Sequence, residues 1–184
     1  IECAAIALKF ADLSGNTIID IQGGGSDLIF PHHEMSASQV RVLTGKEFAL
    51  AYVHAGLIGL DGEKMSKSKG NLIFVSKLIA DGVDPMVIRW ALLKRHYRED
   101  YMWLRSEIDI AKNELEALTL SVQKSSIPLT GDLVKKIYQS MANDLDSPRA
   151  IAAINQWVKS EGSGGDVTEL IDALDSLLGV VLPS

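Results

Sequence analysis

The sequence is short of the residues and runs that would place it in a membrane or an oxidising compartment. Its 184 residues include one cysteine, Cys3, so no disulfide can form within the chain. No apolar run reaches the roughly 20 residues that a membrane-spanning helix needs, and no signal-peptide pattern opens the sequence. A cytoplasmic protein is therefore the default expectation, because disulfides are rare in that compartment.

Basic residues are scarce in the C-terminal part. Residues 105–184 hold 7 Lys and Arg against 12 Asp and Glu, whereas residues 1–104 hold 11 against 12. Nucleic-acid phosphates are bound mainly by Lys and Arg, so an acidic half is a poor platform for RNA or DNA. We expect small-molecule partners rather than nucleic acid. The sequence leaves the oligomeric state open, with a monomer favoured.

The remaining composition is that of a globular protein with a real core. Hydrophobic residues make up 47% and charged residues 23% of the chain, which is ordinary for such a protein, and the length allows one or two domains. The first residue is Ile1, and the opening has neither start-like nor linker-like composition. We therefore expect a piece that begins inside a domain and lacks half of its active site.

Strand and helix patterns are mixed in the first part of the chain. Residues 18–22 are predicted to form a strand that runs into a glycine triplet, and residues 30–44 a turn followed by a helix. Residues 51–60 have strand character, and residues 72–75 read as an extended stretch. This mixture predicts an α/β fold.

From about residue 76 the pattern becomes helical. Asp84 and Pro85 form a cap and first turn, which predicts a helix to about Arg95. Further helices are predicted to begin near residues 106, 130, 147 and 167, each with an apolar stripe that is core by default. Helices without intervening strands predict a small helical bundle. The predicted domains are residues 1–80, a connecting helical segment at 81–104, and the bundle at 105–184.

A lysine pair lies on a short polar loop, in Glu63-Lys64-Met65-Ser66-Lys67-Ser68. Lysine is a compact charge on a flexible stem, suited to following phosphate oxygens as charge moves during a reaction. Two lysines alone are more typical of a solvated basic loop than of a phosphate site, because short motifs have many chance matches.

Three further features could bind a ligand, and each also has a plain structural interpretation. The triplet Gly23-Gly24-Gly25 could expose amide donors to an anion or simply form a tight turn. Asp27 could receive an ammonium or hydroxyl group, or act as a turn residue. His54, in an apolar stretch, could be a core histidine or a donor to a nucleotide.

Cys3 and His32 are the thiolate and imidazole types that zinc favours. A cysteine and a histidine far apart in sequence are a weak signal, since most lone cysteines are small buried apolar residues. Two ligands do not complete a protein zinc site, so at least one more would have to come from elsewhere.

Four motifs together resemble the second half of a class I cysteinyl-tRNA synthetase catalytic domain. They are Ile1-Glu2-Cys3, the string DIQGGGSDLIFPHHE at residues 20–34, HAG at 54–56, and GEKMSKSKGN at 62–71. They occur in the order of that family and cover roughly residues 1–100. The resemblance implies a Rossmann-like domain that activates cysteine with ATP.

Within this family, three features are similar to the mycothiol-pathway ligases, which join cysteine to glucosaminyl-inositol. Ser36 stands where the tRNA enzymes usually have a zinc-ligand glutamate, and Gln22 stands where they usually have histidine. The chain ends about 115 residues after the lysine loop, with an acidic helical part. The alternatives are a cysteinyl-tRNA synthetase fragment and, from another class, a non-catalytic binding or scaffold module.

The resemblance also implies roles for the residues. Cys3 and His32 resemble zinc ligands, completed by a cysteine missing from this chain, and the ion would select the substrate thiolate. Asp27 resembles the residue that receives the cysteine ammonium, and Lys64 and Lys67 those that stabilise leaving pyrophosphate. ATP, accompanied by Mg²⁺, is expected to contact Gly23, Gly24, Gly25, His54, Lys64, Met65, Ser66, Lys67 and Ser68. Because the first-half motifs are absent, the chain alone is expected to be inactive.

Overall fold

The chain folds into two compact units. The computed structural model describes residues 1–11, 14–60, 62–65 and 70–183, and for Lys64 the backbone alone. The first unit comprises Ile1–Ile58 with Arg98–Tyr101, and the second comprises Gly59–Tyr97 with Met102–Ser184. The two compact units therefore divide near residue 58. The domain boundaries predicted at residues 80 and 104 stay predictions.

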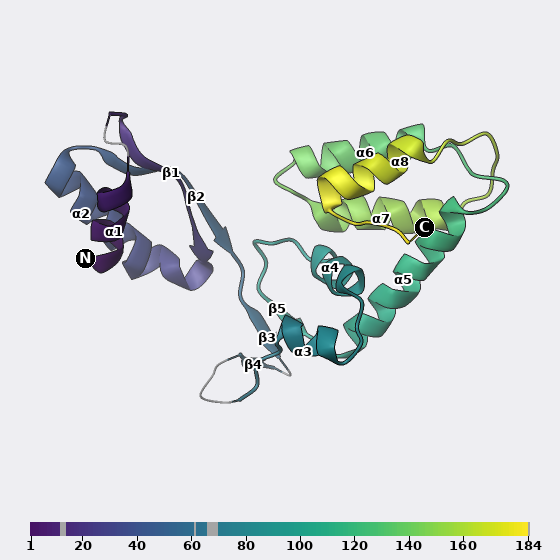
Figure 1. Cartoon of the computed structure of the whole chain (residues 1–184), viewed down its shortest axis with the longest axis horizontal. Coiled ribbons are helices and arrows are strands. Elements are labelled where there is room, and N and C mark those ends of the chain that lie inside the picture. Colours follow the sequence, from purple (N-terminus) through teal and green to yellow (C-terminus); the bar gives the residue numbers. More distant parts are fainter. Residues whose placement is uncertain (12–13, 61, 66–69, 184) are drawn as a thin grey trace. The chain divides into compact units, whose positions relative to one another are not determined.

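The first unit is a parallel strand pair covered by helices (Figure 1). Its elements are α1 (Glu2–Phe10), β1 (Thr17–Gly25), the short helix η1 (Ser26–Leu28), the π-helical turn η2 (Ile29–His33), α2 (Glu34–Thr44) and β2 (Glu47–Ala55). Strands β1 and β2 pair in parallel from Thr17 and Glu47 to Gly25 and Ala55. A helix that connects two parallel strands is the βαβ unit, which confirms the α/β fold.

A small apolar cluster holds the helices against the strands. Ala4 of α1, Ile18 of β1, Val40 of α2 and Phe48 of β2 are each at most 5% exposed. Each of the four elements therefore contributes one buried side chain, and burial of apolar area is the dominant favourable term in folding. The cluster fixes α2 beside the strands and so fixes what its N-terminal end can contact.

Both strands have other bounds than the patterns predict. β1 continues through Gly23-Gly24-Gly25, so the triplet is strand rather than a tight turn or an open nest of amides. β2 begins at Glu47 and ends at Ala55, and β3 (Ile58–Leu60) follows after a break. The single strand predicted over residues 51–60 is therefore two strands.

The break between β2 and β3 is held by a distant segment of the same unit. The Leu57 amide donates to the Asp100 carboxylate at 2.6 Å, and the Tyr101 amide donates to the Leu57 carbonyl at 3.0 Å. These two bonds satisfy backbone groups that no neighbouring strand reaches at Leu57, and an unpaired buried backbone group would be costly.

The second unit begins with a small sheet and continues with helices. β4 (Glu63–Lys64), β3 and β5 (Tyr101–Trp103) form a sheet in that order. The helices are α3 (Val75–Ala80), α4 (Pro85–Leu93), α5 (Ser106–Val122), α6 (Gly131–Ala142), α7 (Ser147–Val158), α8 (Thr168–Ala173) and the turn η3 (Leu174–Leu178). The Asp84 carboxylate accepts from the Met86 amide at 2.7 Å, which confirms the predicted cap of α4.

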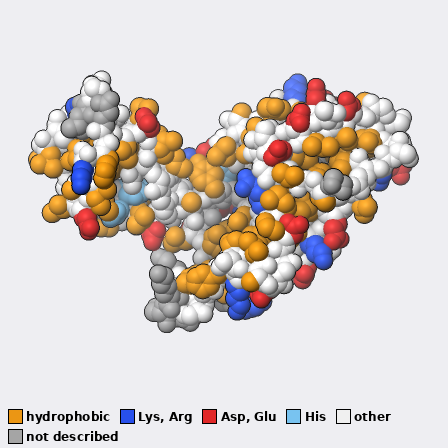
Figure 2. All heavy atoms as spheres, viewed as in Figure 1, with side chains coloured by type: hydrophobic (Ala, Val, Ile, Leu, Met, Phe, Trp, Pro, Cys, Tyr) orange, Lys and Arg blue, Asp and Glu red, His pale blue; other side chains and the backbone are white. Residues whose placement is uncertain are grey.

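The apolar stripes predicted for these helices form the core of the second unit. The largest fully buried side chains include Trp90, Leu118, Ile137, Ile154, Leu170, Leu174 and Leu178. On the face drawn in Figure 2, Lys and Arg are separate spots mixed with acidic side chains over these helices. Among the described residues, no helix combines the length and apolarity needed to cross a membrane.

One half-buried carboxylate joins α4 to α5, and its removal should be costly. Glu114 accepts from Trp90 Nε1 at 2.8 Å and from Lys94 Nζ at 2.9 Å. Glu114→Ala strands the indole N–H and the ammonium, and we expect it to lower the free energy of unfolding by about 2 kcal/mol, as measured by urea denaturation. Glu116→Ala removes an exposed partner 3.9 Å from Lys112 and should cost less than about 0.5 kcal/mol. Equal losses in the two variants would contradict the prediction.

Candidate functional site

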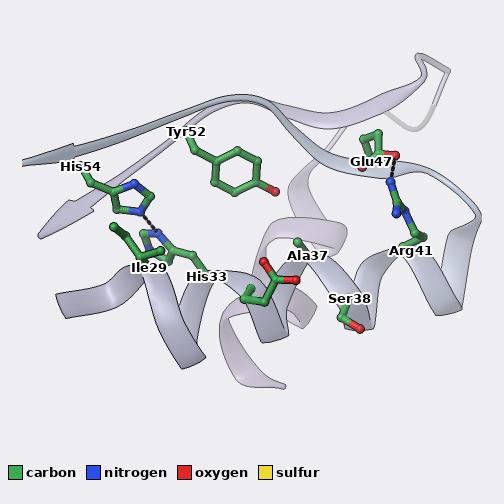
Figure 3. Close-up of a pocket in the computed structure, with 9 residues that line it drawn as sticks. Ile29, His33, Ala37, Ser38, Arg41, Glu47, Tyr52 and His54 are labelled. Atoms are coloured by element: carbon green, nitrogen blue, oxygen red, sulfur yellow. Dashed lines mark hydrogen bonds and ion pairs between the residues drawn. The ribbon is translucent and has the colours of Figure 1, made fainter. Parts of the chain in front are cut away.

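The first unit contains a cavity of about 440 Å³ between β2 and α2. Figure 3 shows its lining, in which His54 and Tyr52 come from β2 and the other side chains come mainly from η2 and α2. The polar side chains that line it are His33, Glu34, Ser38, Arg41, Glu47, Tyr52 and His54. It is a concave site with convergent polar groups, the usual setting for a small-molecule ligand.

The strand register decides which residues face this cavity. Gln22 pairs with Tyr52, and Gly24 pairs with His54. Side chains alternate along a strand, so these four positions lie on one face of the sheet. Because Tyr52 and His54 line the cavity, Gln22 and the bare Cα of Gly24 lie on the cavity side as well.

His33 fills the space that Gly24 leaves. The His33 side chain is buried, and a Cβ on Gly24 would lie 2.8 Å from its Cε1 and 3.3 Å from its Nε2. Gln22 Nε2 lies 2.9 Å from His33 Nε2, and His33 Nδ1 lies 2.8 Å from His54 Nε2. The three side chains form a continuous hydrogen-bonded chain across β1, η2 and β2, which we call the histidine relay.

The surroundings favour the uncharged form of His33. Burial, followed by the neighbouring His54 and His32, lowers the pKa of His33, so its neutral form is favoured at pH 7. Burial also raises the pKa of Tyr52, which keeps its phenol protonated. At the other end of the cavity, Arg41 pairs with Glu47, and both side chains are largely exposed (Figure 3). One end of the cavity is therefore lined by the hydrogen-bonded His33 and His54, and the other by the exposed Arg41–Glu47 ion pair.

Asp27 lies directly after β1, in η1, and its carboxylate folds back over the strand end. A Cβ on Gly25 would lie 2.6 Å from Asp27 Oδ1 and 3.5 Å from Leu57 Cδ2. Glycine at position 25 therefore gives the carboxylate its place. Since side chains alternate along β1, this carboxylate lies on the side opposite to that of Gly24, and the predicted ammonium contact stays a prediction.

Cys3 and His32 are both exposed, near the start of α1 and in η2 respectively. Among the described residues, no group of three or more His, Cys, Asp and Glu side chains is placed to hold a metal ion. Zinc sites in proteins use at least three protein ligands. The described residues alone therefore do not complete a zinc site, and no reaction step is assigned to the ion.

The structure describes part of the lysine loop. Lys64 belongs to β4, which pairs antiparallel with β3, and Met65 is half-buried. Ser66, Lys67 and Ser68 lie outside the described residues. Their predicted contacts with ATP phosphates, like that of Lys64, stay predictions.

The sequence patterns singled out His54 and the glycine triplet but gave no site role to Gln22 or His33. His32 was preferred because the resemblance assigns it to zinc, yet the structure buries its neighbour. The sequence does contain a signal for His33. Positions 22 and 24 share a face of the strand, and the missing side chain at Gly24 leaves room there for an aromatic ring. His32 and His33 are the histidines that follow this strand most closely in the sequence.

The chain matches known proteins over its whole length. The family model described as tRNA synthetases class I (C) catalytic domain matches residues 1–113. L-cysteine:1D-myo-inositol 2-amino-2-deoxy-alpha-D-glucopyranoside ligases from Streptomyces griseus and Rhodococcus erythropolis are 49% and 50% identical to it over 99% of the chain. The chain spans about 45% of the length of each of these curated relatives.

A solved structure supports the fold independently. The chain in the crystal structure of an Agrobacterium radiobacter LeuRS in ternary complex with tRNA and LeuAMS aligns with a TM-score of 0.57. It is 19% identical in sequence, and the alignment covers 89% of this chain and 23% of that one. At this identity the similarity concerns the fold alone.

Proposed function

Because the chain belongs to the class I (C) tRNA synthetase catalytic-domain family, we propose that it is part of an ATP-dependent ligase that joins cysteine to the amine of glucosaminyl-inositol. The observation that carries this proposal is the 47–50% identity, over nearly the whole chain, to relatives named as that ligase. Since the chain spans less than half of each relative, the complete activity belongs to a longer protein.

The reaction consists of two displacements. In the first, the cysteine carboxylate attacks the α-phosphorus of ATP, the bond to the β-phosphate oxygen breaks, and pyrophosphate leaves. In the second, the glucosamine nitrogen attacks the carbonyl carbon of the adenylate, AMP leaves with the bonding electrons, and the nitrogen loses a proton to give an amide. Both steps need charge stabilisation on phosphate oxygens and exclusion of water, the usual work of a nucleotide site.

The described residues suit the adenylate end of this reaction. Gly24 brings bare backbone to the cavity face, so a ligand can approach closely there, and Gly23 and Gly25 are proposed to contact the ligand through the backbone of the same strand end. His54 lines the cavity and offers a ring nitrogen to the nucleoside. Asp27 is proposed to receive the substrate ammonium, because its carboxylate lies at the glycine end of β1.

The phosphate end is assigned to the loop. Lys64 and Lys67 are proposed to stabilise the departing pyrophosphate. Met65, Ser66 and Ser68 are proposed to contact ATP, which is accompanied by Mg²⁺. Two flexible cations on one short loop can follow the negative charge as it moves from the α-phosphorus to the leaving group.

Cys3 and His32 are proposed as two zinc ligands that need a third from the part of the relatives that this chain does not span. Zinc, when bound, would accept the substrate thiolate and so separate cysteine from serine, a distinction that packing alone makes poorly. The two side chains are exposed and therefore accessible to such a completing segment.

A second candidate is a cysteinyl-tRNA synthetase fragment. The matched family is described by that class of enzyme. The acidic residues 105–184 and the mixed charge on the face of Figure 2 disfavour a tRNA-binding surface.

The test is AMP release by the full-length gene product from ATP and cysteine, with glucosaminyl-inositol in one reaction and tRNA in another. Release that depends on the sugar amine is the expected result. Release that depends on tRNA would replace the ligase proposal with the synthetase. No release in either reaction would favour a non-catalytic binding module.

The isolated 184-residue chain should not form cysteinyl-adenylate. The family domain needs a second nucleotide motif that this sequence lacks, so both ends of ATP would not be held at once. The expected result is no cysteine-dependent exchange of pyrophosphate into ATP above background. Exchange by the chain alone would show that residues 1–184 already contain a complete adenylation site.

A further inference from the structure

The histidine relay has a direction, and one side chain sets it. An amide nitrogen can donate hydrogen bonds but cannot accept them. Gln22 Nε2 lies 2.9 Å from His33 Nε2, so the amide donates and the ring nitrogen accepts. A neutral imidazole that accepts at Nε2 carries its proton on Nδ1. His33 Nδ1 must therefore donate across the 2.8 Å contact to His54 Nε2.

The same logic passes to the last ring. His54 accepts at Nε2, so its own proton is on Nδ1. Reversing the first bond would reverse both rings: a carboxylate or amide oxygen facing His33 would place protons on Nε2 of His33 and then on Nε2 of His54. The choice between a donor and an acceptor at the second nitrogen of His54 is thus made at Gln22, two hydrogen bonds away.

The packing around the middle ring holds this chain in place. His33 is 3% exposed and lies against the Cα of Gly24, with Leu28 Cδ1 on the same side. A ring so enclosed has no room to swing away from Gln22 and bond to water instead. Gln22 and His54 are also held by the paired strands, because the register places both on the cavity face.

We infer that Gln22 is a positioning residue, whose amide fixes His33 and His54 as their Nδ1–H tautomers and so makes His54 a hydrogen-bond donor to the ligand of the cavity. The ligand atom that meets this donor is an acceptor: a purine ring nitrogen, or a hydroxyl, carbonyl or phosphate oxygen. The inference concerns the direction of the hydrogen bonds and holds whichever acyl acceptor the full-length protein uses.

The experiment is long-range ¹H–¹⁵N correlation NMR on the 184-residue chain with ¹⁵N-labelled histidine. It is recorded near pH 8, where imidazoles are neutral, because a bare ring nitrogen and a protonated one have well-separated ¹⁵N shifts. The expected result is a protonated Nδ1 and a bare Nε2 on both His33 and His54. Free neutral imidazole side chains favour the opposite tautomer, so an Nε2–H signal from His54 in the native chain would overturn the inference.

Two variants at position 22 separate direction from mere packing. Gln22→Glu presents only acceptor oxygens, so the His54 proton should move to Nε2. Gln22→Met has similar length and no hydrogen-bonding group, so His54 should become a mixture of tautomers. Gln123→Glu, an exposed glutamine in the second unit, makes the same charge change and should leave both tautomers as they are.

Unchanged tautomers in folded Gln22→Glu and Gln22→Met would overturn the role of Gln22. If either variant fails to fold, the native spectrum still decides the direction of the relay. The measurement needs no substrate, so its failure would leave the proposed ligase untouched, and a negative AMP-release assay would leave the relay untouched.

Discussion

Gly24→Ala is expected to lower AMP release by the full-length protein about 100-fold, because displacements near 1 Å in a positioned site have effects of that order. The added Cβ would lie 2.8 Å from His33 Cε1 and 3.0 Å from Leu28 Cδ1. His33 is buried, so its ring has to move, and its bonds to Gln22 and His54 lengthen with it. Overpacking of this kind also costs stability, about 2 kcal/mol.

The matched control is Gly23→Ala, one residue earlier on the same strand. Its Cβ points to the opposite face and meets only the Val53 carbonyl oxygen at 3.9 Å, an ordinary contact. We expect less than about a threefold loss of AMP release there, since strand interiors tolerate alanine as well as glycine. Equal losses of AMP release in the two variants would mean that the glycines act through backbone contacts with the ligand. The position of the His33 ring would then be unimportant for the reaction.

Much of the fold follows from the periodicity of the sequence, because both helix stripes and strand runs report on burial. The apolar stripes of α4 to α7 predicted those helices to within a few residues, and Asp84-Pro85 marked the start of α4 because a cap and a first-turn proline are local signals. The extension of β1 through three glycines was not predictable in this way. Glycine has low strand propensity, and only pairing with Val53, His54 and Ala55 keeps the triplet extended.

The site was predicted in part. His54 lines the cavity and Gly24 lies on the same face of the strand pair, whereas Gly23 and Gly25 face the other side, and the ligand contacts of all four residues stay predictions. The relay was not foreseen, because Gln22, His33 and His54 are brought together by tertiary packing across 32 residues of chain. Cys3 and His32 have side chains of types that zinc favours, yet the described residues bring no third such side chain to them, so the zinc site stays a prediction.

The division of the chain near residue 58 was also invisible to the patterns. Residues 51–60 form one apolar run, so periodicity predicts one strand. Gly56 and Leu57 interrupt it because the segment 98–101 returns there and takes up the backbone groups of Leu57. A contact between residues more than 40 positions apart leaves no local signal, except that the interrupting residue is glycine.

That glycine gives the second large prediction: Gly56→Ala should lower the free energy of unfolding of the first unit by about 3 kcal/mol. A Cβ at this position would overlap the carbonyl group of Glu99 and lie 2.7 Å from the Asp100 amide nitrogen. Both obstacles are backbone, so no side-chain rotation relieves them, and overpacking against backbone belongs to the costly end of its range. Urea denaturation measures the loss, and amide hydrogen exchange at Leu57 and Tyr101 reports whether the returning segment has detached.

Gly15→Ala is the control for that measurement, because its Cβ would meet nothing closer than the Thr17 carbonyl oxygen at 3.8 Å. A neutral result there and a large loss at Gly56 would explain the glycine of the HAG motif as a packing requirement: the returning segment needs the space that a side chain would fill. Unchanged stability in Gly56→Ala, combined with lost AMP release, would contradict this explanation. It would mean that the ligand, and not the returning segment, needs the space at Gly56. The two outcomes differ in a quantity measured without substrate, so the test separates support of the site from contact with its ligand.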